Sequence, residues 1–133
     1  MNADLAELAQ AALARTGAAS SAILVFDAAG KLVLGAASGI SGEPLERLLD
    51  AVQSPDHPVA RTGRDAQAGF DVTPIAPGGP ALRSHVPLLV ADEPGRSVGV
   101  LALAHQLPLT EDQRDQAFAL ASEAAQLAAQ RVG

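Results

Sequence analysis

The sequence predicts an α+β domain with a helix at each end and an antiparallel β-sheet of five to six strands between them. Three observations indicate this class. Apolar residues recur at helical spacing near both ends, short apolar runs between them pair into hairpins, and the middle holds one more helical pattern beside proline-rich loops. A chain of 133 residues can bury one core, so residues 1–133 are expected to form a single domain.

Leucine and alanine at helical spacing predict the first and last helices. The first helix begins near the amino terminus and ends at Gly17. The last begins at Thr110, where Thr110 and Gln113 have the spacing of a capping box, and its alanine-rich stripe continues to the end of the chain. The stripe is wide and its side chains are small, which favours close packing against a sheet or another helix.

Two hairpins supply most of the predicted sheet. Residues 22–26 and 31–34 are apolar runs joined by residues 27–30, a turn with an acidic first residue and a final glycine. Both runs are almost wholly apolar, so we expect both strands to be covered on both faces. Residues 83–90 and 97–105 form the second hairpin around a polar connection.

The middle of the chain is less regular. Pro44 opens a helix that carries leucines on one side and ends before Pro55. Residues 57–63 indicate one short turn. Residues 68–75 alternate weakly and are followed by prolines, which predicts an edge strand and then a loop.

Composition excludes several kinds of protein. The chain has no cysteine, so it forms no disulfide, thiolate nucleophile or cysteine-ligated metal site. Aromatic residues make up 2% and the formal net charge is −6, which argues against the aromatic, cationic grooves that bind nucleic acid. No apolar run has the length of a membrane span, and the amino terminus lacks the pattern of a signal peptide. We therefore expect a cytoplasmic protein that binds neither nucleic acid nor membranes.

Four segments, in this order and spacing, resemble the GAF domain family. Residues 83–90 look like the family's serine-plus-proline-leucine strand, and residues 97–103 look like its glycine-centred strand. Residues 108–112, which precede the alanine-rich helix, are similar to the closing segment. Residues 57–63 resemble the short helix and turn before the third strand. The likeness spans nearly the whole chain, and indicates a small GAF-like sensory domain, stand-alone or excised from a longer signalling protein.

The resemblance implies a central antiparallel sheet with the first and last helices packed on one face and short helices and loops covering the other. It implies a small-molecule pocket between the middle segment and that second face. It also implies a non-enzymatic regulatory domain in signal transduction, which relays ligand binding through the packing of those helices to a signalling output protein. We expect a homodimer through the first and last helices, because their apolar stripes look wider than one sheet face needs. The cofactor, if any, is unknown from sequence.

Departures from the family narrow this expectation. The cysteine that anchors bilins is missing, as are the redox cysteines of GAF-type methionine sulfoxide reductases. The asparagine-lysine-phenylalanine-aspartate-glutamate signature of cyclic-nucleotide-binding members has no counterpart. An alternative function is a ligand-free dimerisation module of the roadblock or longin type, which also places helices on one face of an antiparallel sheet.

Five residues are candidate ligand-binding groups: His57, Arg61, Phe70, Arg83 and His85. The arginines can hold a carboxylate or phosphate through paired hydrogen bonds, or can be solvated or paired with acidic neighbours. His85 is either a ligand-binding group on the pocket side or a hydrogen-bonded core histidine. The alternative for His57 is a capping or surface residue. The alternative for Phe70 is an ordinary core residue.

Neither a catalytic group nor a metal ligand set is predicted. The three histidines have no local chelating spacing. Ser84 and His85 are adjacent on a strand, so their side chains point to opposite faces and cannot act together as nucleophile and base. Three arginines flank the irregular middle of the chain: Arg61, Arg64 and Arg83. If no ligand takes them, they are expected to be solvated or to pair with Asp65 and Asp71.

Overall fold

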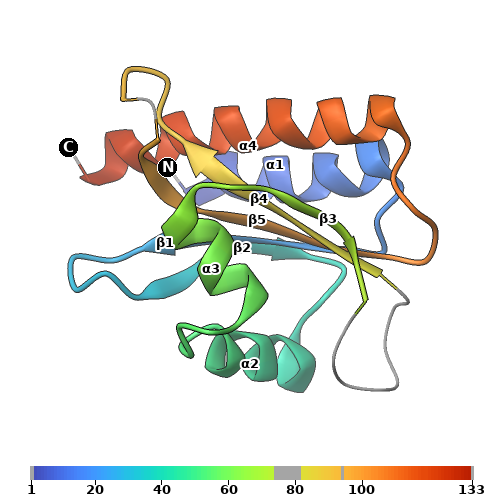
Figure 1. The fold of residues 1–133 in the computed structure, drawn as a ribbon, viewed down its shortest axis with the longest axis horizontal. Helices are drawn as coiled ribbons and strands as arrows, with labels where there is room; N and C mark the ends of the chain where they lie inside the picture. Colours follow the sequence, from blue (N-terminus) through green and yellow to red (C-terminus); the bar gives the residue numbers. More distant parts are fainter. Residues whose placement is uncertain (1, 74–81, 94, 133) are drawn as a thin grey trace.

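The computed structural model describes residues 2–73, 82–93 and 95–132 (Figure 1). The elements follow in the order α1 (Asn2–Thr16), β1 (Ser20–Phe26), β2 (Leu32–Ser38), α2 (Gly42–Ala51), α3 (Pro58–Asp65), β3 (Gly69–Val72), β4 (Leu82–Leu89), β5 (Ser97–His105) and α4 (Glu111–Val132). Within these residues, five antiparallel strands form one sheet in the order β2-β1-β5-β4-β3. The predicted α+β class is confirmed.

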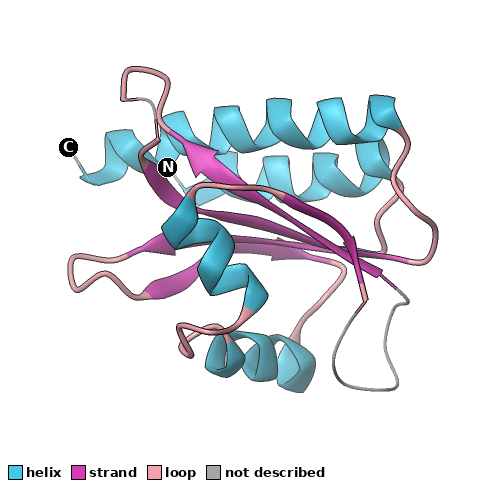
Figure 2. Cartoon of the chain, viewed as in Figure 1, coloured by secondary structure: helices cyan, strands magenta, loops and turns pink. Residues whose placement is uncertain are grey.

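The elements stack in three layers, with the sheet in the middle. Helices α1 and α4 lie side by side on one face, while α2 and α3 lie on the other (Figures 1 and 2). Each face has its own apolar cluster. The larger cluster joins α1 and α4 to the sheet through residues such as Leu5, Leu101 and Leu120, and the smaller one joins α2 and α3 to it through Leu48 and Val59.

The alanine-rich stripe of α4 is buried inside the chain. It packs against the sheet and against α1, which contributes its own small residues, and these contacts bring the two helices close together. The buried alanines are Ala9 and Ala12 of α1 and Ala117, Ala121, Ala124, Ala125 and Ala128 of α4. Packing within one chain therefore accounts for the width of the stripe.

The first hairpin departs from the sequence prediction at its second strand. β1 is buried on both faces as expected, but β2 lies at the sheet edge and leaves Val33 and Leu34 exposed. The expectation that both strands are covered on both faces is therefore wrong for β2. The strand also continues to Ser38, beyond the predicted residue 34, because a register shift at Gly35 lets the chain stay paired with β1.

Helix α3 lies where the residue pattern predicts one short turn and the family resemblance predicts a short helix, at residues 57–63, and it continues to Asp65. Its eight residues begin with Pro58, which suits the first position of a helix, and His57 caps it because its Nδ1 accepts a hydrogen bond from the Val59 N–H at 3.1 Å. Ala66, with a φ of 58°, ends it in the left-handed conformation.

The predicted start of α4 and the predicted edge strand are both present. Thr110 and Gln113 form the capping box, with the Gln113 N–H donating to Thr110 Oγ1 at 3.1 Å and the Thr110 N–H donating to Gln113 Oε1 at 2.8 Å. β3 is the edge strand next to β4. Of the range predicted for it, residues 74 and 75 lie outside the described part of the chain.

Candidate ligand-binding site

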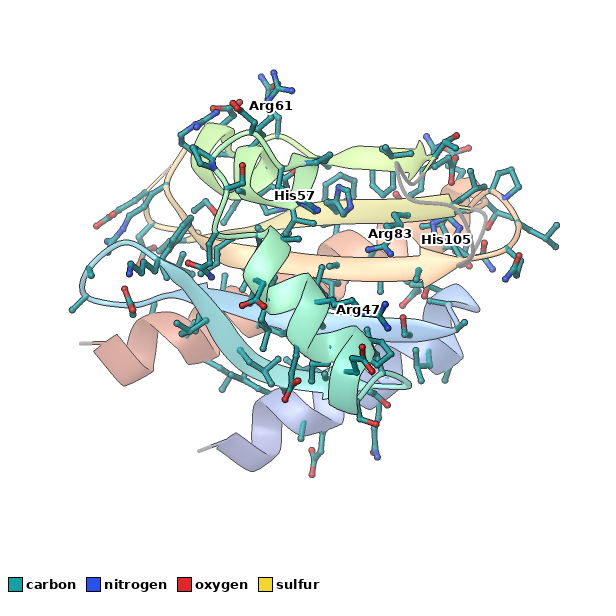
Figure 3. The ribbon with its side chains drawn as sticks, turned by 90° about the horizontal axis from the view of Figure 1, so that it is seen from below. Arg47, His57, Arg61, Arg83 and His105 are labelled. Atoms are coloured by element: carbon teal, nitrogen blue, oxygen red, sulfur yellow. The ribbon has the colours of Figure 1, made fainter. Side chains whose placement is uncertain are left out.

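Arg83 and His85 point to the face of the sheet that α3 covers. On β4 the alternate residues Val86 and Leu88 belong to the cluster with α1 and α4, so Arg83 and His85 face the other way. His57, at the start of α3, is close enough for its charge to act on His85, and Arg83 acts on both imidazoles. Figure 3, which looks onto this face, shows His57 and Arg83 in the space beside α3. We call His57, Arg83 and His85 the Arg83 site.

Two buried polar atoms of the Arg83 site lack a hydrogen-bond partner among the described residues. They are Arg83 Nε and His85 Nε2, and the His85 side chain is almost wholly enclosed, with 3% of the residue exposed. Buried polar groups in proteins are nearly always hydrogen-bonded. The interpretation of His85 as a hydrogen-bonded core histidine therefore does not explain its Nε2 atom, and a polar ligand group or water is the expected partner.

The two imidazoles of the site are neutral at pH 7. Burial lowers the pKa of His85 to about 4, and the positive charges of His57, Arg83 and His105 act in the same direction. Burial and then Arg83 also lower the pKa of His57. Because His57 Nδ1 accepts from the Val59 N–H, its own proton resides on Nε2, which makes that atom a donor. The site thus offers one permanent positive charge and neutral imidazole groups.

Arg61 and Phe70 do not join these three residues. Arg61 is exposed and points outward from α3 (Figure 3). Phe70 packs edge-on against Phe118 with ring centroids 5.5 Å apart, and the Arg114 guanidinium lies 4.8 Å from the Phe70 ring centre. Phe70 therefore packs against α4, on the far side of the sheet from α3.

Of the two acidic residues expected to pair with the arginines that flank the middle of the chain, one does so and the other pairs with an arginine of α4. Asp65 pairs with Arg64, whose Nε lies 3.3 Å from Asp65 Oδ1, as one interpretation of the sequence predicted. Asp71 pairs instead with Arg114, whose Nη2 lies 2.6 Å from Asp71 Oδ2, so its expected pairing with Arg61, Arg64 or Arg83 is wrong. The reason is the turn of β3, which aims this carboxylate at α4.

Asp71 is a link between β3 and α4 that the sequence did not reveal. Its Oδ1 accepts the Leu109 N–H at 2.9 Å, and its own N–H donates to Ser84 Oγ at 3.1 Å. Burial alone raises its pKa, but the Leu109 N–H and the Arg114 guanidinium outweigh that effect, and the pKa is lowered overall. Asp71 is therefore ionised at neutral pH and ties the edge of the sheet to the start of the last helix.

Ser84 and His105 form a buried pair on the α4 side of the sheet. Ser84 Oγ and His105 Nε2 lie 2.8 Å apart, and His105 Nδ1 lies 2.7 Å from the Leu107 carbonyl oxygen. That carbonyl only accepts, so Nδ1 carries the proton and Nε2 accepts from the serine hydroxyl. This is the arrangement of a nucleophile and its base, but both residues are enclosed, with 0% and 2% exposed. The pair holds β4, β5 and the following loop together.

A shallow cavity of about 220 Å³ lies at another part of the α2–α3 side. It is open to solvent and lies between the turn of the first hairpin and the segment around α3. Its lining includes Lys31, Gln53 and Arg64 but none of the Arg83 site.

Across residues 2–73, 82–93 and 95–132, no three histidine, aspartate or glutamate side chains gather in a way that would hold a metal ion. No helix in this part of the chain is both long and apolar enough to span a bilayer.

Lowering the pH from 7 to 5 is expected to cost about 2 kcal/mol of unfolding free energy through His85. Its pKa rises from about 4 in the folded state to 6.5 when exposed. The unfolded chain therefore takes up the proton first as the pH falls, and stability is lost progressively from pH 6.5 down to pH 4. Urea unfolding at pH 7, 6 and 5 measures this, and His85→Gln should flatten the slope. An equally steep slope in that variant would contradict the assignment to His85.

The five-stranded sheet, with terminal helices on one face and short helices on the other, is the architecture of a GAF domain. By sequence alone, no protein-family model and no curated protein matches the chain. Solved structures do match it over nearly its full length, and this chain has the GAF fold.

Three of these structures show the range of proteins with this fold. The GAF-B domain of DevS from Mycobacterium smegmatis is 25% identical with a TM-score of 0.75, covering 98% of this chain and 97% of that one. A domain of a putative two-component sensor histidine kinase from Sinorhizobium meliloti 1021 is 21% identical with a TM-score of 0.67, covering 97% and 90%. A type II free methionine-R-sulfoxide reductase from Thermoplasma acidophilum is 12% identical with a TM-score of 0.73, covering 96% and 91%.

Proposed function

We propose that this GAF domain is a non-enzymatic sensory domain of signal transduction that binds a small molecule on the α2–α3 side of its sheet. The observation that carries the proposal is the Arg83 site, where a buried guanidinium nitrogen and a buried imidazole nitrogen have no partner among the described residues. Buried polar groups in proteins nearly always have a hydrogen-bond partner, so we propose that a bound small molecule supplies the partner of these two atoms. The likeness to a domain of a sensor kinase supports a role in signalling.

Chemistry of the reductase kind is not proposed for this chain. The Thermoplasma protein shares only the fold at 12% identity, and the present sequence contains no cysteine. The Ser84–His105 pair has the hydrogen bonds of a catalytic pair but lies enclosed within the α4 side of the sheet. A ligand that is bound and released unchanged is the simpler proposal.

The relay is proposed to run from the Arg83 site through β3 to α4. Gly69 of β3 pairs with His85, and Val72 pairs with Arg83, so a ligand that moves the β4 residues also moves the edge strand. Asp71 lies between these two pairs and holds Arg114 and the Leu109 N–H. Ligand binding would then shift the population of arrangements at the start of α4, which a signalling output protein reads.

We also propose that the domain forms a homodimer through the outward faces of α1 and α4. The buried stripe is used within one chain, but small exposed residues such as Ala6, Ala14 and Ala119 remain on the outside and permit close approach of a second copy. Light scattering at micromolar concentration should give twice the mass of one chain. Ala119→Arg should give the monomer, and the control Ala51→Arg, at an exposed position of α2, should not. A wild-type monomer would overturn this part.

A thermal-shift screen of small metabolites tests the sensory role. A specific ligand at 100 times its Kd should stabilise the fold by about 2.7 kcal/mol, which raises the unfolding temperature by several degrees. Hydrogen exchange with each hit should then show protection at the start of α3 and along β4. If no compound stabilises the protein, the ligand-free dimerisation module is the better account. Hits that all map to α1 and α4 would contradict a binding site on the α2–α3 side.

A further inference from the structure

We propose that the Arg83 site binds the carboxylate of a small aliphatic acid. This inference rests on the proposed function and names the chemical class of its ligand. The Arg83 Nε atom is buried, and no described residue accepts a hydrogen bond from it. A guanidinium offers paired N–H donors in one plane, which match the two oxygens of a carboxylate.

The two acidic residues that the sequence offers as partners for Arg83, Asp65 and Asp71, are engaged elsewhere. Asp71 uses both of its oxygens, for Arg114 and for the Leu109 N–H, and Asp65 pairs with Arg64. The permanent charge that acts on both His57 and His85 is the positive charge of Arg83. A local excess of positive charge, in a protein with a formal net charge of −6, favours an anionic ligand.

The amount of charge favours a carboxylate over a phosphate. His57 and His85 are neutral at pH 7, which leaves Arg83 as the permanent charge of the site. One carboxylate balances one guanidinium, whereas a doubly charged phosphate would keep an unpaired negative charge in a partly enclosed place. Arg47 extends from α2 toward this space in Figure 3, but it is exposed and its charge is screened by solvent.

The imidazoles supply the remaining polar contacts. The Nε2–H of His57 is fixed as a donor by the hydrogen bond at its Nδ1 atom. His85 Nε2 has no described partner and, in the tautomer that protonates it, is a second donor. Arg83 and these two histidines can therefore surround one carboxylate without any further charge.

The row of alanine side chains beside His85 on the sheet favours a ligand with a short aliphatic chain. In the strand register His85 lies opposite Ala102, Ala102 opposite Ala22, and Ala22 opposite Ala37, so one row across β4, β5, β1 and β2 continues in methyl groups. These three alanines face the α2–α3 side, in the cluster that contains Leu48. The side chains that pack beside His85 on this face are therefore aliphatic, which suits an apolar ligand body better than a polar one.

Binding of butyrate, butyramide and inorganic phosphate to the full chain at pH 7 tests the inference, by calorimetry or saturation-transfer NMR. Butyramide keeps the size of butyrate without its charge. We expect butyrate to bind in preference to both others. Arg83→Gln should weaken butyrate binding about 10- to 100-fold, the range for a hydrogen bond between charged groups. Arg83→Lys, which keeps the charge but loses the paired donors, should fall between. The matched control Arg61→Gln, on the outward side of α3, should bind as the wild type does.

Several results would overturn the carboxylate assignment: equal binding of butyrate and butyramide, preference for phosphate, no binding of any probe, or unchanged binding by a folded Arg83→Gln. If Arg83→Gln fails to fold, Arg83→Lys decides in its place, since it retains the charge. These failures differ from failure of the sensory role. A neutral or cationic compound that stabilises the protein and protects β4 from hydrogen exchange would support the proposed sensory function but contradict the assignment of a carboxylate ligand.

Discussion

Replacing Gly99 with alanine is expected to destabilise the domain by at least about 3 kcal/mol, much of the total stability of an ordinary domain. A Cβ atom at this position would lie 2.0 Å from the Leu24 carbonyl oxygen and 2.9 Å from the Val25 Cα atom. These are backbone atoms of β1, buried at the centre of the sheet, and they cannot move aside as a flexible side chain would. Gly99 thus permits the close approach of β1 and β5.

Urea unfolding measures this loss, and Gly69→Ala is the matched control. Gly69 is also a strand glycine, but the nearest atom to its added Cβ is Val72 Cγ2 at an ordinary contact distance of 3.7 Å. The control should change stability by less than about 1 kcal/mol. If Gly99→Ala were as stable as the wild type, the close approach of the two central strands would be incorrect.

Asp71→Ala is expected to cost about 3 kcal/mol and to loosen the start of α4. The change removes the acceptor of the Leu109 N–H and the partner of Arg114, and it puts alanine at a φ of 57°. The ion pair itself contributes only a minor part, because the Arg114 side chain is 42% exposed. Asp71→Asn tolerates positive φ and keeps an oxygen acceptor, so its cost should be nearer 1 kcal/mol.

The proposed relay adds a second measurement for the same residue. In a double-mutant cycle, Asp71→Asn and Arg114→Gln should show a coupling of about 0.5–1 kcal/mol. Hydrogen exchange of the first turn of α4 should rise in Asp71→Ala, while exchange at the buried pair of strands β1 and β5 changes little. If the stability effects of the two single substitutions are additive, or if hydrogen exchange in the first turn of α4 is unchanged in Asp71→Ala, the proposed link between β3 and α4 is contradicted.

Local patterns were enough to predict most of the fold. The capping box at Thr110, the apolar periodicity of α1 and α4, and the two hairpins each depend on residues that are close in sequence. The second strand was predicted too short because Gly35, Ala36 and Ala37 have weak strand preference, and pairing with β1 overrides it.

The orientation of Arg61 depends on helix α3, for which the residue pattern indicates one short turn and the family resemblance a short helix. In α3 the buried positions are Val59, Thr62 and Gly63, which have the spacing of one helical face. Arg61 and Arg64 must then lie on the other side. His57 and Pro58, an N-cap followed by a proline, were the signal that residues 57–63 begin a full helix.

Contacts between distant residues could not be predicted from one sequence. Asp71 meets Arg114 across 43 positions, and Ser84 meets His105 across 21. Nothing in the neighbourhood of Asp71 distinguishes Arg114 from the other arginines, because the partner is chosen by the turn of β3 and the start of α4. Strand alternation did place His85 on the other face of β4 from Val86 and Leu88. Only the packing of α3 shows which face of the sheet holds the histidine.

Amide NMR spectra of the isotope-labelled chain, recorded with and without the strongest hit of the metabolite screen, test the central claim most directly. The account predicts shifts at residues 83–86 of β4 and at the start of α3, with a second set at residues 109–114 that is lost in Asp71→Ala. Shifts confined to the outer faces of α1 and α4, with none at Arg83 or His85, would contradict a sensory site on the α2–α3 side of the sheet.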